Sequence, residues 1–313
     1  MRILVMGGTR FIGIYLTQIL VEKGHEVVLF NRGNKPSPVE GLQQIHGDRT
    51  DPDQIKAKLG NERFDAIFDN NGRKLKDTQI LAELFKDQVQ HFVYMSSAGV
   101  YLKSDEMPHK EGDNIDPKSR HYGKYETETD LQEQGIPWTS IRPTYIYGPL
   151  NYNPLEAWFF DRIMANRPIP IPGHGLHITQ LGHVKDLANA MAAVLYNQKA
   201  IGQIYNISGD RYVTFDGLAK ACAVAAGKSP EDVELVHYDP KQFDFGKKKA
   251  FPLRLQHFFA DIQKATQDLN WQPEYDLISG LKDSFQKDYL VNQPDTTGVD
   301  FSLDDKILKA VAV

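Results

Sequence analysis

The sequence predicts an α/β fold, a doubly wound parallel sheet with a smaller C-terminal lobe, on three observations. The chain opens on an apolar run, Arg2–Met6, which is typical of a strand covered on both faces. Gly7 and Gly8 end that strand, and apolar residues recur at helical spacing over Phe11–Lys23. Further apolar runs then alternate with helical stretches through the first 150 residues, which indicates a Rossmann-type domain.

The later elements follow the same order along the chain. Gly24 ends the first helix, and the alternation of strands and helices that follows is typical of a right-handed doubly wound sheet. The expected strands are Val27–Phe30, Ala66–Phe68, Phe92–Met95 and Trp138–Ile141, and the expected helices lie near 52–59, 76–88 and 118–134.

The alternation loosens after Pro149, where proline and glycine gather around Pro168–Gly175. A helix near 184–197 and a strand near Ile204–Ile207 are expected to rejoin the main sheet. The predicted domains are therefore a Rossmann domain over 1–150, rejoined by about 183–208, and a smaller lobe over 151–182 and 209–313. Helices of that lobe are expected near 214–226, 260–269 and 276–290, followed by a polar tail.

Composition and charge limit the classes of function. The 313 residues are 41% hydrophobic and 25% charged, which is typical of a globular protein, and no apolar run approaches the roughly 18 residues of a membrane span. The opening MRILVMGG has no signal or transit pattern, which predicts a cytoplasmic protein. With 36 basic and 41 acidic side chains the net charge is −5, so a surface for nucleic acid must be local. The single cysteine, Cys222, is expected in the core.

The first candidate site is the glycine turn. A strand, the segment Gly7–Gly13 and a helix place bare backbone amides and a positive helix end where a pyrophosphate can lie, and the alternative is a tight turn without a ligand. The segment resembles the GGxGFIG of extended short-chain dehydrogenases. Arg10 stands at the middle glycine, where it would reach a phosphate or obstruct the cofactor. The residues assigned to the cofactor are Gly7, Gly8, Thr9, Arg10, Phe11, Ile12 and Gly13.

The end of the second strand sets the predicted cofactor. An NAD site would carry an acidic residue there to accept from the ribose 2′-hydroxyl, but the chain has Asn31 and Arg32. Because a guanidinium suits a 2′-phosphate, the sequence favours NADP over NAD. Asp48 matches the aspartate that holds the adenine amine in the extended dehydrogenases, and the alternative is a turn-forming aspartate.

The reaction centre of the extended dehydrogenases is altered in this sequence. That family uses a Ser or Thr after the fifth strand, then a Tyr and a Lys four residues apart, with the lysine lowering the pKa of the tyrosine. Ser97 and Lys124 match, but Arg120 stands at the tyrosine position and keeps its proton at neutral pH. Tyr122 is the candidate substitute, yet two residues along a helix it should face away from Lys124. The sequence therefore argues against ordinary dehydrogenase or epimerase chemistry.

Lys124 has a second predicted role, because a lysine there can hydrogen-bond a nicotinamide ribose even without the redox step. The alternative is an exposed ion pair between Lys124 and Glu128. The sugar-nucleotide segment, GDGxQxRDFxHVxD in the family, is altered too, since Thr179 replaces the arginine that clamps the substrate diphosphate. His183 and Asp186 match and are expected to be structural.

Longer segments resemble one branch of these proteins, the chloroplast stem-loop-binding protein family, and most of all its b-type. They cover nearly the whole chain and are far more specific than the glycine motif, and the chain looks like a cyanobacterial relative. The segments are GGTRFIG (7–13), FDNNGR (68–73), SSAGVYLKS (96–104), WTSIRPTYIYGPLNYNP (138–154), RPIPIP (167–172), QLGHVKDL (180–187), YVTFDGLAKAC (212–222) and FDFGKKKAFPLRLQHFF (243–259).

The resemblance implies an RNA-binding protein on an epimerase-like fold, acting as a divalent-metal-dependent endoribonuclease that favours stem-loops. It also implies a homo-oligomer associated with ribosomes and transcription. Mg²⁺ held by carboxylates would serve such cleavage. Asp48, Asp69 and Asp113 show no metal-ligand spacing, so the metal ligands and the residues that cleave RNA stay unassigned.

The segment 241–257 allows a local RNA surface. Its basic side chains alternate with Phe243, Phe245 and Phe251, and basic groups beside aromatic rings suit phosphates and unpaired bases. The alternative is a solvated loop whose phenylalanines anchor it to the core. The residues assigned to RNA are Lys241, Lys247, Lys248, Lys249 and Arg254. A second candidate surface is Arg73, Lys74 and Lys76, whose alternative is a polar loop after the fourth strand.

Three functions stay open from the sequence. The first is RNA binding, with or without cleavage of stem-loops. The second is an NADP-dependent oxidoreductase or epimerase/dehydratase for a small molecule or sugar, with Tyr122 or a substrate group replacing the lost tyrosine. The third is a scaffold in which bound NADP reports redox state to an RNA or protein partner.

Overall fold

A seven-stranded parallel sheet forms the frame of the first structural unit. In the computed structural model, which describes residues 1–292 and 295–311, the strands lie in the order β3-β2-β1-β4-β5-β6-β11. This order confirms the predicted fold class. The strands are β1 (Arg2–Met6), β2 (Glu26–Asn31), β3 (Gln43–His46), β4 (Ala66–Asp69), β5 (His91–Met95), β6 (Trp138–Pro143) and β11 (Gln203–Ile207).

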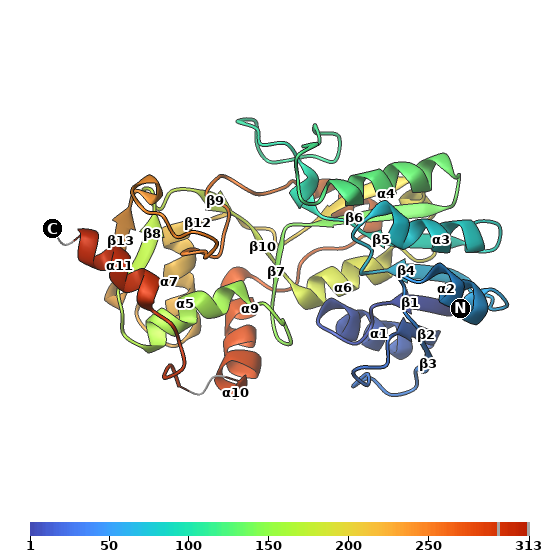
Figure 1. The fold of residues 1–313 in the computed structure, drawn as a ribbon, viewed down its shortest axis with the longest axis horizontal. Helices are drawn as coiled ribbons and strands as arrows, with labels where there is room; N and C mark the ends of the chain where they lie inside the picture. Colours follow the sequence, from blue (N-terminus) through green and yellow to red (C-terminus); the bar gives the residue numbers. More distant parts are fainter. Residues whose placement is uncertain (293–294, 312–313) are drawn as a thin grey trace. The chain divides into compact units, whose positions relative to one another are not determined.

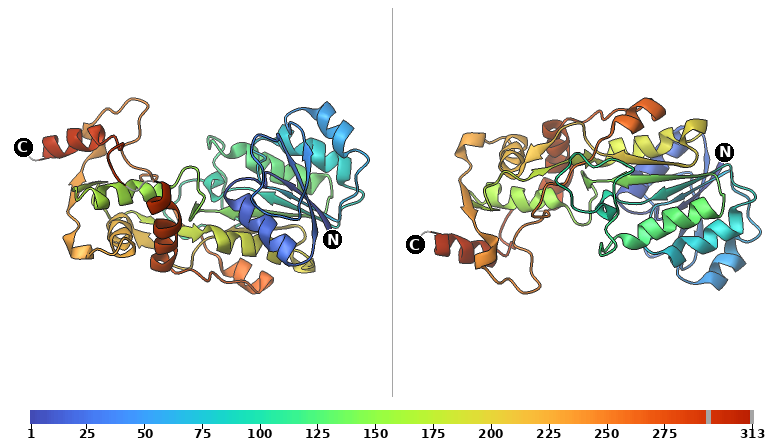
Figure 2. Two further views of the ribbon diagram at one scale, coloured as in Figure 1. Left: turned by 90° about the horizontal axis from the view of Figure 1, so that it is seen from below. Right: turned by 90° about the horizontal axis from the view of Figure 1, so that it is seen from above.

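Helices cover both faces of that sheet, as Figures 1 and 2 show. One face carries α1 and α6, which pack on each other, and the other carries α2, α3 and α4. Side chains such as Ile67 of β4 and Leu81 of α3 meet in a fully buried core on the second face. Within residues 1–292 and 295–311 no helix is long and apolar enough to cross a membrane. The helices are α1 (Ile12–Glu22), α2 (Pro52–Leu59), α3 (Leu75–Phe85), α4 (Tyr122–Glu133), α6 (Val184–Ala193) and α8 (Gln263–Leu269).

The order in which strands join the sheet changes side at β1: β2 and β3 lie on one side of it, and β4, β5 and β6 lie on the other. Met6 at the end of β1 lies opposite Asp69 at the end of β4, so the loops that follow both strands leave from one edge. In open parallel sheets ligands bind at the carboxyl ends of the strands at such a point. The glycine turn and the segment after Asp69 therefore share the edge where a ligand is expected.

The second unit has its own apolar core. Phe159, Phe160 and Phe215 are fully buried in it, and Cys222 is buried among them, as predicted. Short strand pairs β7–β10, β8–β13 and β9–β12 lie around this core. The strands are β7 (Tyr145–Tyr147), β8 (Ile169–Pro172), β9 (Ile178–Thr179), β10 (Leu181–His183), β12 (Val213–Thr214) and β13 (Leu235–Tyr238). The helices are α5 (Leu155–Met164), α7 (Phe215–Ala225), α9 (Leu277–Ser284), α10 (Leu290–Asn292) and α11 (Ser302–Val311), with a π-helical turn at Phe285–Tyr289.

Both units draw on separate stretches of the chain. The first comprises Met1–Thr144, Val184–Ser208 and Ala260–Gln272, and the second comprises Tyr145–His183, Gly209–Phe259 and Pro273–Val313. The expected polar tail is wrong, because residues near the C-terminus form α11. Leu303 and Ile307 stand four residues apart and pack against Tyr238 and Ala250, which fixes the helix on its unit.

Candidate functional site

The glycine turn joins β1 to α1 through a close backbone contact. Gly7 has a φ of +86°, and a Cβ on Gly13 would lie 2.1 Å from the carbonyl oxygen of Gly7, so both positions require glycine. Phe11 precedes α1 with its side chain buried, so it can offer a ligand only its backbone, whereas Arg10 is exposed. Among the described residues no side chain caps the start of α1, and its first turn holds no acid. A helix end of this kind suits a pyrophosphate.

The end of β2 carries the two residues predicted to choose the cofactor. Asn31 forms a turn, because its Oδ1 accepts from the N–H of Gly33 at 2.7 Å, and Arg32 is exposed. Asp48 accepts from the N–H and the hydroxyl of Thr50 at 2.8 and 2.7 Å, and these bonds lower the pKa of Asp48. This is the geometry of a turn-forming aspartate, and an adenine contact by Asp48 stays a prediction.

A buried ion pair, which the sequence did not single out, ties the end of β4 to the loop after β3. The guanidinium of Arg49 donates to both carboxylate oxygens of Asp69, at 2.6 and 2.9 Å, and also contacts the side chain of Asn71. Asp69 is fully buried and accepts from the hydroxyl of Thr78 at 2.6 Å. Burial would raise the pKa of Asp69, but Arg49 outweighs it and holds that pKa below its usual value. The two partners lie 20 residues apart, so no local spacing announces them.

Two polar side chains at the carboxyl ends of β4 and β5 have no partner in the described part of the chain. They are the amide of Asn70 and the hydroxyl of Ser96, and both are shielded from water. Because an unpaired buried polar group is costly, such atoms suit a ligand that bonds them. Asn71 lies against the turn, with its Nδ2 2.9 Å from where a Cβ of Gly7 would stand. With the uncapped start of α1, these residues fit a dinucleotide, which would supply a nicotinamide for hydride transfer.

Lys124 is half-buried at the same edge of the sheet. Its ammonium donates to the carbonyl oxygens of Gly72, at 3.0 Å, and of Met95. Burial lowers the pKa of Lys124 to about 8, although the charges of Asp69 and Glu128 act in the opposite direction. The expected alternative, an exposed ion pair with Glu128, is wrong because backbone carbonyls hold the ammonium and Glu128 is buried.

Glu128 instead pairs with a strand. Its carboxylate accepts from Nε and Nη2 of Arg142 in β6, at 3.0 and 2.5 Å, and from the hydroxyl of Ser140 at 2.7 Å. Arg142 is 1% exposed, and its guanidinium lies 5.0 Å from the ring centre of Tyr101. Burial would lower the pKa of Arg142, and the bond to Glu128 raises it. The partner of Glu128 is therefore determined by the packing of α4 on the sheet and not by helical spacing.

The remaining reaction-centre residues have separate surroundings. Ser97 accepts from the N–H of Gly99 at 3.0 Å and caps the 3₁₀ turn that follows it. Tyr122 begins α4, and its ring contacts that of Tyr125 with centroids 5.8 Å apart. Arg120 is exposed in the turn before α4. A catalytic role for Ser97 or Tyr122 stays a prediction.

We expect the Lys124→Met variant to lose a specific pH dependence of stability. The unfolded chain holds a proton on Lys124 up to about pH 10.4, whereas the folded chain releases it near 8. Between these values the unfolded state binds more protons, so this group makes the wild type more stable as pH rises. The Tm of the wild type relative to the variant, followed by circular dichroism, should therefore increase from about pH 7 to about pH 10. A constant difference would contradict the lowered pKa.

The altered sugar-nucleotide segment is buried. Thr179, which replaces the family's arginine, is 1% exposed in β9. His183 stacks on Tyr275 with ring centroids 3.8 Å apart and lies 3.4 Å from the carboxylate of Asp283. Asp186 is 1% exposed in the first turn of α6. Packing accounts for His183 and Asp186, in line with the structural role expected of them.

The basic segment 241–257 is a loop of the second unit that turns its rings inward. Phe251 is buried and packs on Trp158 and Phe159, so of the two alternatives this ring anchors the loop and offers no face to a base. Phe243 and Phe245 are half-buried and stacked on each other, with centroids 5.5 Å apart. The rings therefore anchor the loop. Of the basic residues, Arg254 is half-buried over the ring of Phe258, and the exposed ones are Lys241, Lys247, Lys248 and Lys249.

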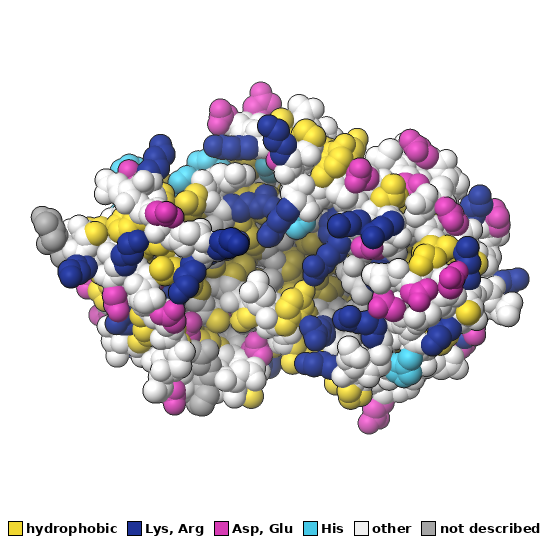
Figure 3. Space-filling model, in the orientation of Figure 1, with side chains coloured by type: hydrophobic (Ala, Val, Ile, Leu, Met, Phe, Trp, Pro, Cys, Tyr) yellow, Lys and Arg dark blue, Asp and Glu magenta, His cyan; other side chains and the backbone are white. Residues whose placement is uncertain are grey.

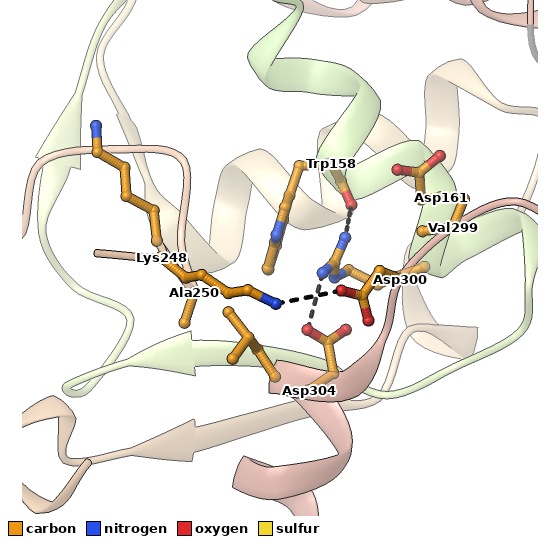
Figure 4. Close-up of a pocket in the computed structure, with 10 residues that line it drawn as sticks. Trp158, Asp161, Lys248, Ala250, Val299, Asp300 and Asp304 are labelled. Carbon is orange, nitrogen blue, oxygen red and sulfur yellow. Dashed lines mark hydrogen bonds and ion pairs between the residues drawn. The ribbon is translucent and has the colours of Figure 1, made fainter. Parts of the chain in front are cut away.

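A hollow of about 360 Å³ lies beside this loop (Figure 4). Lys248 reaches toward Asp300 in it, with Nζ 3.6 Å from the carboxylate, and both side chains are two-thirds exposed. Arg162 donates to Asp304 at 2.8 Å and to the carbonyl of Trp158 at 2.7 Å. Because exposed ion pairs contribute little, the pair of Lys248 leaves this lysine available to a phosphate.

The three carboxylates considered for a metal lie in different surroundings. Asp48 closes a turn, Asp69 is bound by Arg49, and Asp113 accepts from the N–H of Lys110 at 3.1 Å and lies 3.2 Å from Nδ1 of His109. Across residues 1–292 and 295–311, no three His, Cys, Asp or Glu side chains gather as metal ligands.

Known proteins are similar to this chain in sequence and in fold. The sequence model of the NAD dependent epimerase/dehydratase family matches residues 3–208. The chain is 54% identical, over 98% of its length and 84% of the relative's, to the chloroplast stem-loop binding protein of 41 kDa b of Arabidopsis thaliana. Both matches confirm the resemblances seen in the sequence.

Solved structures match at lower identity. The UDP-glucose 4-epimerase of Thermotoga maritima aligns with a TM-score of 0.77 at 21% identity, covering 92% of this chain and 98% of that one. The dTDP-glucose 4,6-dehydratase of Bacillus anthracis, solved with NAD, gives 0.75 at 19% identity over 94% and 98%. The likeness to these two enzymes shows the fold alone. On its sequence, the chain belongs to the NAD dependent epimerase/dehydratase family, in the branch of the chloroplast stem-loop-binding proteins.

Proposed function

We propose that this protein binds stem-loop RNA on an epimerase-like fold. Its identity of 54% with the Arabidopsis stem-loop binding protein, over 98% of the chain, carries the proposal. The surface of the second unit supports it, because Lys247, Lys248 and Lys249 stand exposed on a loop that buried rings anchor. Lysines on a fixed loop can follow the phosphates of one strand even though the net charge of the chain is −5.

The reaction of the family lacks its proton donor and acceptor in this chain. Arg120 stands at the tyrosine position, and a guanidinium keeps its proton at neutral pH. The ring of Tyr122 packs on Tyr125, while the ammonium of Lys124 bonds backbone carbonyls. These contacts favour RNA binding over an oxidoreductase or epimerase function.

The test is a titration of labelled stem-loop RNA against the protein, beside the same RNA made linear by base changes, with Mg²⁺ and with EDTA. Selective retention of the stem-loop is expected. Equal retention of both RNAs, or none at moderate salt, overturns the proposal. Cleavage that appears only with Mg²⁺ would extend the activity to a metal-dependent endoribonuclease.

Replacing Lys247, Lys248 and Lys249 together by alanine should weaken RNA binding and flatten its dependence on salt. Each lost phosphate contact lowers the slope of log affinity against log salt by about 0.7–0.9, so the three together lower it by about 2.1–2.7. Filter binding at several salt concentrations measures both quantities. A control with Lys220, Lys228 and Lys282 replaced, all outside the loop, should keep the slope of the wild type. An unchanged slope in the loop variant would remove this loop from the RNA surface.

Dinucleotide binding is the second candidate function, and the unpartnered Asn70 and Ser96 favour it. The exposed Arg32 supports NADP as the dinucleotide, because a guanidinium can clamp its 2′-phosphate. Calorimetry should then give tighter binding for NADP than for NAD, and Arg32→Ala should abolish the difference. If neither dinucleotide gives a heat of binding at about millimolar concentration, the dinucleotide site is excluded.

Oligomerisation, association with ribosomes or transcription, and a cytoplasmic location complete the proposal. The first would be visible in the molar mass from light scattering. The location stays a prediction from the N-terminal sequence, since the Arabidopsis relative is named as chloroplastic.

A further inference from the structure

We propose that a hollow on the first unit is a second RNA-contact surface, which holds the phosphodiester backbone. This cationic hollow is lined by Arg73, Lys74, Lys76 and Arg120, with a volume of about 560 Å³. The inference rests on the proposed function, because it names a further part of the surface that RNA would touch. It also gives a role to Arg120, the residue that stands at the tyrosine position.

Two segments that are far apart in the sequence form this hollow. Arg73, Lys74 and Lys76 lie at the start of α3, and Arg120 precedes α4. The helices pack on each other, and a Cβ on Gly123 would lie 3.0 Å from the carbonyl oxygen of Arg73. The bare backbone of Gly123 thus lets the start of α4 approach the loop before α3. A rigid frame therefore brings four cations together.

The charges of the hollow are not neutralised. All four cationic side chains are exposed, and in the part of the chain that the structure describes none of them forms an ion pair. Among the described residues that line the hollow, Glu126 alone carries a carboxylate. The nearby Asp77 accepts instead from the N–H groups of Arg73 and Lys74, each at 3.1 Å. In Figure 3, Lys and Arg side chains gather on the visible face of this unit.

The chemistry of the lining selects phosphates. The guanidinium groups of Arg73 and Arg120 can each grip a phosphate through two parallel hydrogen bonds, and the lysines add point charges beside them. Of the described residues that line the hollow, none is aromatic, so it offers no ring for a base to stack on. The surface should therefore hold the backbone whatever the sequence, and position the RNA rather than read it.

The test compares two double variants of the full chain. Arg73→Ala/Arg120→Ala removes both guanidinium groups, and the charge-matched control Arg63→Ala/Lys86→Ala removes two exposed cations of the same unit away from the hollow. In the first variant affinity for stem-loop RNA should fall at least tenfold, by a rough estimate, and the salt slope by about 1.5. The control should match the wild type. Equal Tm values show that each variant is folded.

Two further arms make the outcome decisive. Arg120→Lys keeps the charge but loses the paired N–H donors of the guanidinium. This variant should therefore bind stem-loop RNA more weakly than the wild type, with a nearly unchanged salt slope. NADP binding is measured on the same double variant, because Arg120 stands at the tyrosine position of the reaction centre. The inference is overturned if the wild type binds RNA and the double variant binds equally well, or if the double variant loses NADP alone. If the wild type itself binds no RNA, the proposed function fails instead.

Discussion

The Glu128→Gln variant should lose about 3–5 kcal/mol of its free energy of unfolding, because it leaves the charge of Arg142 buried without a counter-charge. Glu128 and Arg142 are 2% and 1% exposed, and the carboxylate accepts from two nitrogens of the guanidinium. An amide can still accept a hydrogen bond, but it has no charge to offset the cost of burying the guanidinium. The loss of unfolding free energy therefore reports what the negative charge of Glu128 contributes to stability.

Urea unfolding followed by circular dichroism gives the free energy. The control is Glu133→Gln, an exposed carboxylate on the same helix, which should stay within about 0.5 kcal/mol of the wild type. A loss below about 1 kcal/mol for Glu128→Gln would show that water reaches Arg142 in the folded protein.

Local patterns were enough to predict the frame of the fold. The apolar run at Arg2–Met6 and the glycines after it predict β1, the turn and α1, because strand pattern, glycine turn and helical spacing are all visible within this short stretch. The parallel direction of the strands and the hand of their crossovers follow from the alternation of strands and helices. The family likewise follows from long segments, whose many residues together leave few alternatives.

Contacts between distant segments were not predictable. Helical spacing offered Lys124 as the partner of Glu128, yet the packing of α4 on β6 presents Arg142 to it instead. No pattern in the sequence around Arg73 predicts that Arg120 lines the same hollow. The sequence left open whether Phe251 meets a base or anchors its loop, and it packs in the core because Trp158 and Phe159 lie behind the loop. In each case the partner is chosen by tertiary packing rather than by spacing.

Replacing Arg49 by methionine should destabilise the protein by about 3–5 kcal/mol at neutral pH, since it leaves the fully buried Asp69 ionised without its cation. The pH dependence of the stability that Asp69 contributes should also reverse in sign. In the wild type the pKa of Asp69 lies below its unfolded value, so the stability that the pair contributes is present above about pH 4 and is lost as pH falls through the folded pKa.

In the Arg49→Met variant, burial without the guanidinium raises the pKa of Asp69 above its unfolded value. The folded state then holds a proton that the unfolded state has released, so the stability that Asp69 contributes falls as pH rises from about 4 toward that raised pKa. We therefore expect the difference in the free energy of unfolding between variant and wild type, measured by urea unfolding, to be smaller at about pH 5 than at about pH 7. The double variant Arg49→Met/Asp69→Asn should recover much of the loss at neutral pH, because it removes the unpaired charge. An equal gap at both pH values would mean that Arg49 acts through packing alone.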